Sequence, residues 1–338
     1  MNSSLAQIIE KDPANWRGKD MMNRTNWRAS LTETHKYELK EAVEKAQSSK
    51  AALLSLEKCD FALPTLGPFL ADLNTQLEGG PGFVVIEGLP ALDYDENAGK
   101  TALWGVGLHM GEPAKQDGDG NLLHSVRDTG QKVDGSDNIR SYQTNDQLSF
   151  HNDGADVFLL FCLRDGKSGG MSRLVSSVAV FDELLKRRPD LAETLLQDYW
   201  FDTRGQRTDG ARVEVMPVYH HHHGLLTANM KYRYIHTAQR FADVPRLTQN
   251  QRDALEMVQD IANEPDMVME FTLNPGDILV ANNYVTLHGR SAFEDWDEPD
   301  KRRHMLRLWL TIPNGRPLPQ AFKGSRIYAE AYERRMER

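Results

Sequence analysis

Short hydrophobic runs separated by Gly, Pro and polar clusters recur from about residue 80 onward, a pattern that is typical of β-strands. The run "GFVVIEGLP" (82–90) is rich in β-branched residues and lies between glycines, so it predicts a strand. Further strands are predicted at 140–144, 157–163, 172–175, 213–217, 267–272, 277–281 and 304–312. Many short strands with helices concentrated early favour a mainly β fold with helical additions (α+β), of the sandwich or jelly-roll type.

The first 75 residues have a different pattern and predict a helical N-terminal extension. In "SLTETHKYELKEAVEKAQ" the apolar positions are sparse, and Ser30 and Glu33 have the spacing of a capping box, so a surface helix is expected to open at Ser30. The stretch "PTLGPFLADLNTQLEGG" predicts a second helix that ends at its glycine pair. One clear helix is expected among the strands, beginning near Ser177, with Pro189 opening another turn.

A single domain is expected over 1–338, with the helical layer at 1–75, a β core at 80–313 and a C-terminal tail at 314–338 that forms a surface helix. Residues 114–139 are polar and rich in Gly and Asp, and they predict a long loop. Loops of this length in a compact domain usually carry function.

Composition narrows the class of partner. The net charge is −9 and no basic run occurs, which argues against a nucleic-acid partner. The longest apolar run has about ten residues, well short of the roughly 20 of a membrane helix. The N-terminus lacks a basic start followed by an apolar core, and the only two cysteines, Cys59 and Cys162, form no disulfide framework. We therefore expect a cytoplasmic protein that acts on a small molecule, and the oligomeric state stays open.

The stretch "SFHNDGAD" contains the first candidate chemistry. On a strand, His151 and Asp153 would face the same way, about 6–7 Å apart. A His-x-Asp pair is common by chance, so a third ligand is needed, and His288 in "LHGR" is the candidate. Two histidines and one carboxylate suit non-haem Fe(II) with one face open for substrate and oxygen. An ordinary loop role for His288 stays open on this pattern alone.

The segment "KRRHMLRLWLTIP" predicts a strand with two different faces. Alternation places Arg303 and Arg307 on one face with Met305 and Trp309, while aliphatic residues occupy the other. Buried guanidinium groups are costly without anions. Two interpretations remain, internal salt bridges or two carboxylate-type anions bound in a cavity, and no acidic residue lies on the same strand.

Together these pieces resemble the taurine dioxygenase (TauD/TfdA) family of Fe(II)- and 2-oxoglutarate-dependent oxygenases. "GFVVIEGL", "FHNDGAD", "KSGGMSRLVS", "PGDILVANNYVTLHGR" and "RRHMLRLWL" occur in the family's order and cover about two-thirds of the chain. The resemblance implies a double-stranded β-helix, the jelly roll expected above. It implies iron bound by His151, Asp153 and His288, and 2-oxoglutarate whose distal carboxylate is held by Arg303 and by the hydroxyl of Ser172.

The resemblance also implies the reaction. With O2, the family converts 2-oxoglutarate to succinate and CO2 while oxidising an unactivated C–H bond of its substrate. Halogenating relatives have Gly or Ala where this chain has Asp153, so hydroxylation is expected. Arg307 matches a position that grips the substrate's anion in several members, which implies an amino acid or a related carboxylate or sulfonate. The alternatives are desaturation or oxidative cyclisation at the same centre, or a non-catalytic jelly-roll binding protein.

Some further residues carry a weaker signal. Gln143 and Asn145, before the His-x-Asp pair, and Arg233 in "MKYRYIHTAQR" are candidates for substrate binding, with ordinary structural roles equally open. The four histidines His220–His223 are better explained as a solvated hairpin turn than as a metal site, because adjacent residues on a strand cannot converge on one ion.

Overall fold

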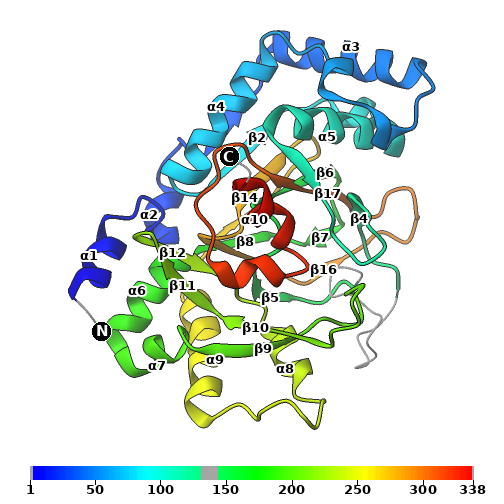
Figure 1. Cartoon of the computed structure of the whole chain (residues 1–338). Helices are drawn as coiled ribbons and strands as arrows, with labels where there is room; N and C mark the ends of the chain where they lie inside the picture. Colours follow the sequence, from blue (N-terminus) through cyan, green and yellow to red (C-terminus); the bar gives the residue numbers. More distant parts are fainter. Residues whose placement is uncertain (1–2, 131–143, 337–338) are drawn as a thin grey trace.

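Two β-sheets pack against each other at the centre of the molecule (Figure 1). The computed structural model describes residues 3–130 and 144–336. The strands are β1 (Arg28–Ser30), β2 (Phe83–Glu87), β3 (Glu112–Ala114), β4 (Leu123–Val126), β5 (Leu148–His151), β6 (Val157–Arg164), β7 (Ser168–Gly169), β8 (Ser172–Ser176), β9 (Asp198–Asp202), β10 (Val213–Pro217), β11 (Tyr219–His222), β12 (Leu225–Ala228), β13 (Met269–Phe271), β14 (Ile278–Asn282), β15 (Thr286–Arg290), β16 (Phe293–Glu294) and β17 (His304–Thr311). The helices are α1 (Ser3–Lys11), α2 (Gly18–Met22), α3 (Glu33–Ser48), α4 (Leu66–Gly79), α5 (Glu96–Met110), α6 (Ser177–Arg187), α7 (Pro189–Thr194), α8 (Tyr232–Ala238), α9 (Gln249–Ala262) and α10 (Ala329–Met336).

The larger sheet has the strand order β1-β2-β14-β6-β17-β3, with β4 also paired to β17. The smaller sheet has the order β13-β8-β15-β5. Alternation along the larger sheet separates two cores: on β6, Phe158 and Cys162 face the smaller sheet, whereas Leu159 and Phe161 face the helices. This is the jelly-roll arrangement expected from the sequence.

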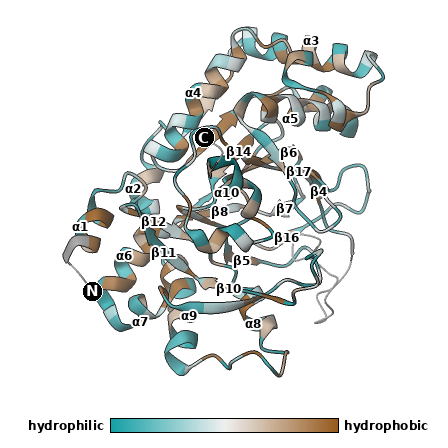
Figure 2. Ribbon diagram, in the orientation of Figure 1, coloured by the Kyte–Doolittle hydropathy of each residue, from teal (hydrophilic) through white to brown (hydrophobic). Residues whose placement is uncertain are grey.

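Helices cover the outer faces of both sheets (Figure 1). α3, α4 and α5 pack over the larger sheet, with buried contacts from Leu39, Leu70 and Trp104. α6, α7 and α9 pack beneath the smaller sheet and the hairpin β11–β12. Figure 2 shows hydrophobic residues concentrated in the central strands and in the helices beside them. Within the described part of the chain, no helix combines the length and the apolar character needed to span a bilayer.

Most predicted strands are confirmed to within a few residues, but the helices were underestimated. α3 is capped by Thr32 and not by Ser30, which lies in β1, because the Thr32 side chain accepts from His35 N. The helices α5 and α9 were missed, although Thr248 and Gln251 form a capping box at the start of α9. The strand expected at 140–144 falls almost wholly outside the described residues.

Three other expectations need correction. The polar stretch 114–139 contains the strand β4. The C-terminal segment is more than a surface helix, because Tyr328 and Ala331 are buried. The four histidines do form a hairpin with β12, but His220 is buried and its ring packs edge-on against Phe322.

Candidate active site

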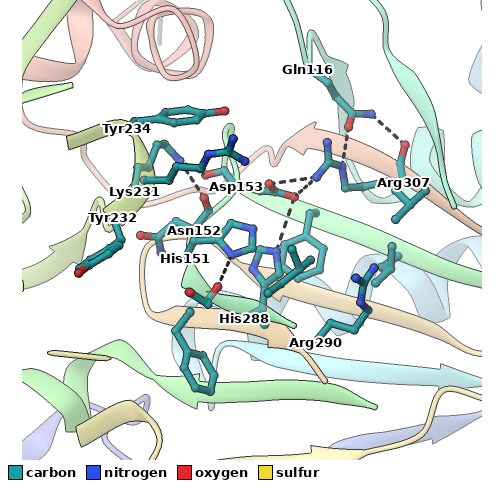
Figure 3. Close-up of a pocket in the computed structure, with 18 of the residues that line it drawn as sticks. Gln116, His151, Asn152, Asp153, Lys231, Tyr232, Tyr234, His288, Arg290 and Arg307 are labelled. Atoms are coloured by element: carbon teal, nitrogen blue, oxygen red, sulfur yellow. Dashed lines mark hydrogen bonds and ion pairs between the residues drawn. The ribbon is translucent and has the colours of Figure 1, made fainter. Parts of the chain in front are cut away.

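A cavity of about 260 Å³ lies at one end of the two sheets (Figure 3). Two kinds of wall enclose it, and we name them by the elements that supply them. The strand side consists of His151, Ser172, His288, Arg290, Arg303, Arg307 and Trp309. The cap side consists of Lys231, Tyr232, Arg233, Tyr234, Arg326 and Ile327, from α8 with the residue before it and from the segment before α10.

His151, Asp153 and His288 come together in this cavity. His151 ends β5 and pairs directly with His288 on β15, so their rings lie 4.3 Å apart between centroids. Asp153 follows two residues later, and His288 Nε2 lies 3.8 Å from its Oδ2. One donor atom from each residue lies within 4.8 Å of the other two. The arrangement is compact enough for three ligands of one metal ion.

The protonation states of these groups fit metal binding. Burial lowers the pKa of His151 and lowers the pKa of His288 well below its ordinary value, so both rings are neutral near pH 7. His151 Nδ1 donates to the Ser149 carbonyl at 2.9 Å, which leaves Nε2 free to act as a ligand. Burial opposes ionisation of Asp153, yet the nearby Arg307 guanidinium holds the pKa of its carboxyl below the ordinary value.

The Asp153 carboxylate is oriented by strand β17. Arg307 Nη1 lies 3.1 and 3.0 Å from its two oxygens, and Trp309 Nε1 donates to Oδ2 at 3.1 Å. Gly154 permits this approach, because a Cβ there would lie 2.5 Å from the Trp309 ring. The residue after the carboxylate must therefore lack a side chain.

Arg307 has a carboxylate partner within the protein, and its expected contact with a substrate anion stays a prediction. No acid lies on its own strand, but Asp153 reaches it from across the sheet, and its Nε donates to Gln116 Oε1 at 2.8 Å. Its charge is therefore offset by the carboxylate of the His–Asp–His cluster without any substrate. Sequence alternation placed Arg307 in the cavity correctly but could not identify a partner 154 residues away.

The cap side contacts the backbone of the segment that carries Asp153. Lys231 Nζ donates to the carbonyls of Asn152 at 2.8 Å and Asp153 at 3.2 Å, and it lies 5.6 Å from the centre of the Tyr328 ring. The Tyr328 hydroxyl donates to Asn229 Oδ1 at 3.1 Å. Burial lowers the pKa of Lys231 to about 7. Figure 3 shows Lys231 beside Asn152, on the opposite side of the cavity from Arg290.

Ser172 and Arg303 lie on the strand side, where the sequence placed them. Ser172 begins β8 and is buried, and Arg303 precedes β17 and is 3% exposed. Gly170 has φ +68°, and a Cβ there would lie 3.1 Å from Arg303 Nε. The glycine pair before Ser172 thus makes room for the guanidinium group.

The other candidate substrate-binding residues differ in whether they line the cavity. Arg233 lines the cavity from α8. Asn145 is exposed and is not among the residues that line the cavity, and its carbonyl accepts from Phe293 N, so its contact with substrate stays an untested prediction. Gln143 lies outside the described residues.

Comparison with known proteins identifies the family. Residues 44–309 match the model of the family described as taurine catabolism dioxygenase TauD, TfdA family. The chain belongs to the TauD/TfdA family. It is therefore a non-haem iron, 2-oxoglutarate-dependent dioxygenase, as its sequence motifs predicted, and the alternative of a non-catalytic binding module is set aside.

Individual relatives of this TauD/TfdA chain support the same family assignment. FR-33289 synthase from Streptomyces rubellomurinus (strain ATCC 31215) is 29% identical over 331 residues, covering 95% of this chain and 97% of that protein. A crystal structure of asparagine oxygenase with Fe(II), 2S,3S-3-hydroxyasparagine and succinate has a TM-score of 0.65 at 18% identity, covering 84% of this chain and 94% of that one. The non-heme iron oxygenase OrfP with Fe and alpha-ketoglutaric acid has a TM-score of 0.60 at 15% identity, covering 84% and 93%. At these identities the two structures establish the shared fold.

Several residues that line or adjoin the cavity escaped the sequence-based prediction. Arg290 could have been found, because it lies two residues after His288 on a strand and so shares its face. Lys231, Tyr328 and Gln116 carried no local signal, because each acts through contacts with distant parts of the chain.

Proposed function

We propose that this dioxygenase binds one Fe(II) ion through His151, Asp153 and His288 and hydroxylates an unactivated C–H bond of a small anionic molecule. The observation that carries the proposal is the convergence of two neutral imidazoles and one ionised carboxylate in one cavity. This donor set is the one that leaves an open face on non-haem iron. When bound, iron with 2-oxoglutarate and O2 supplies the oxidising chemistry, and 2-oxoglutarate leaves as succinate and CO2.

The chain's own residues bind and orient the reactants. Arg307 and Trp309 hold the Asp153 carboxylate in place, while Lys231 and Tyr328 hold the backbone of the loop that carries it. Arg303, with an Nη1 that has no partner among the described residues, is the proposed anchor for the distal carboxylate of 2-oxoglutarate. The Ser172 hydroxyl is proposed to support it.

The charge of the cavity supports an anionic substrate. Among the described residues that line it, seven are Arg or Lys and one, Asp153, is acidic. The basic residues of the cap side, Lys231, Arg233 and Arg326, line the cavity. We propose that they attract the anionic group of the substrate, in place of the Arg307 contact expected from the sequence. An amino acid or a related acid fits this cavity, and asparagine oxygenase and OrfP have been crystallised with hydroxylated amino acids.

The test is a screen of carboxylic, sulfonic and phosphonic acids for substrate-stimulated conversion of 2-oxoglutarate to succinate. Fe(II)-loaded protein would be incubated with each compound under 18O2, and the products read by mass spectrometry. Hydroxylation predicts one 18O atom in the product. A product that has lost two hydrogens without gaining oxygen would instead indicate desaturation or cyclisation, and the absence of stoichiometric Fe(II) binding would contradict the proposed centre.

A further inference from the structure

Arg290 occupies the same face of the smaller sheet as the proposed metal and cosubstrate residues. It lies two residues after His288 on β15, and it pairs directly with Ser172 on β8. Residues two apart on a strand, and residues directly opposite on neighbouring strands, project to the same side of a sheet. His288, Arg290 and Ser172 accordingly all line the cavity. Figure 3 shows Arg290 beside His288.

Arg290 also lies close to Arg303. Both guanidinium groups lie over the ring of Phe293, at 4.6 Å for Arg290 and 5.2 Å for Arg303. Arg290 is 4% exposed and Arg303 is 3% exposed. Two buried cations thus share one aromatic support at one end of the cavity.

The protein supplies hydrogen-bond acceptors for only some of the guanidinium N–H groups of Arg290 and Arg303. Arg290 Nη2 donates to the carbonyls of Thr144 at 2.7 Å and Asp146 at 2.6 Å, whereas its Nε and Nη1 have no partner among the described residues. Arg303 Nη1 likewise has none, and the nearby Asp295 accepts from the backbone N of Arg303 and not from its guanidinium. Buried N–H groups of a cation that lack acceptors are expensive. A ligand that brings acceptors to this spot would recover that cost.

The distal carboxylate of a keto acid would supply the missing acceptors. From His288 to Arg290 is one strand repeat, about 6–7 Å, which is comparable with the length of a five-carbon keto acid whose other end chelates a metal at His288. A carboxylate offers two oxygens with about four acceptor sites. It can therefore accept from Arg290, Arg303 and the Ser172 hydroxyl at once.

We infer that Arg290 is a second guanidinium that binds the distal carboxylate of 2-oxoglutarate, together with Arg303. This inference rests on the proposed function, since it assumes the cosubstrate site beside the His–Asp–His cluster. It adds a specificity determinant: two guanidinium groups favour a keto acid with a second carboxylate over one without.

The test measures binding and does not need turnover. Anaerobic protein loaded with Mn(II) would be titrated by calorimetry with 2-oxoglutarate and, in parallel, with 2-oxobutyrate, which keeps the chelating end but lacks the distal carboxylate. Arg290→Gln retains an amide that can donate to the Thr144 and Asp146 carbonyls. We expect it to weaken 2-oxoglutarate binding at least tenfold and to leave 2-oxobutyrate binding unchanged, with Arg290→Lys intermediate.

Arg316→Gln is the matched control, because Arg316 is also a buried arginine that donates to a main-chain carbonyl, that of Leu226, but it lies outside the cavity. It should leave the binding of both keto acids unchanged. Wild-type 2-oxoglutarate affinity in Arg290→Gln, or an equal loss for both keto acids, would overturn the inference. If the wild-type protein bound Mn(II) but not 2-oxoglutarate, the proposed function itself would fail, and the two failures are thereby distinguishable.

Discussion

The strand side and the cap side of the cavity hold the same aspartate by different means. On the strand side, backbone ladders fix the side chains: His288 pairs with His151 on one neighbour and with Leu174 on the other. The cap-side residues that the structure describes belong to no strand, and Lys231 and the neighbouring Tyr328 contact main-chain carbonyls from separate segments. Asp153 lies between them, with its carboxylate oriented by β17 and its backbone held by the cap side. The proposed metal centre therefore depends on both walls, although its two histidines come from the strand side alone.

The largest effect is expected on the strand side itself. His288→Ala removes one of three proposed ligands, and we expect it to lower Fe(II) affinity and 2-oxoglutarate turnover by more than about 100-fold, beyond the loss typical of outer-shell changes. His221→Ala is the control, since His221 is an exposed histidine on β11. Fe(II) titration under anaerobic conditions gives the affinity. Retention of wild-type affinity in His288→Ala would remove it from the metal centre.

The next largest effect is expected from the ion pair that joins α10 to the segment after Asp153. Arg335 of α10 lies 2.8 Å from the fully buried Asp156, three residues after Asp153. Arg335→Met leaves that carboxylate uncompensated, so the free energy of unfolding should fall by about 3–5 kcal/mol in urea titrations. Arg334→Met removes a more exposed arginine next to it and should cost less than about 1 kcal/mol.

If the Arg335 effect arises from the uncompensated charge, adding Asp156→Asn should recover part of the loss. A double variant no more stable than Arg335→Met would mean that packing of α10, and not the ion pair, matters.

A smaller effect is expected from the cap-side lysine. Lys231→Met keeps the length of the side chain but removes its donation to the carbonyls of Asn152 and Asp153. The loop that carries Asp153 becomes less restrained, and we expect metal affinity to fall about tenfold, in the range seen for residues that orient ligands. A Co(II) absorption titration measures this, with the exposed Lys186→Met as control. Unchanged Co(II) affinity and spectrum would show that the strand side alone positions the carboxylate.

The smallest effect concerns the loss of folding stability at acidic pH. Burial lowers the pKa of His220 to about 4, and its ring packs on Phe322, which stacks on Tyr328 of the cap side. The folded-state pKa lies below the unfolded value of about 6.5, so the unfolded state binds more protons, and stability falls as the pH drops from about 6.5 towards 4.

His220→Phe should therefore reduce the loss of stability between pH 7.5 and 5.5 by on the order of 1 kcal/mol. Thermal or urea unfolding at the two pH values checks this, and the exposed His221→Phe should behave as the wild type. An identical pH dependence in His220→Phe would exclude His220 as the source.

The same contrast explains what the sequence could predict. The pair His151 and Asp153 follows from its spacing and ligand chemistry, whereas His288 needed the family resemblance as well. Strand alternation predicted the face that carries Arg303 and Arg307. The partners of the cap side come from segments about 80 to 175 residues from Asp153, and no local pattern encodes such contacts. The Asp153 partner of Arg307 and the position of Asn145 outside the cavity lining were not predictable for the same reason, because each depends on the three-dimensional position of another segment.

The register of β15 determines the positions of both His288 and Arg290, which have different proposed binding roles. His288 faces His151 and Arg290 faces Ser172 only in the observed pairing. A slip of one residue would turn both side chains to the opposite face of the sheet at the same moment. A molecule with such a slip would therefore lose its proposed metal ligand and its inward-facing arginine together. Binding of the proposed metal ion would therefore also report that β15 is correctly aligned with its neighbours.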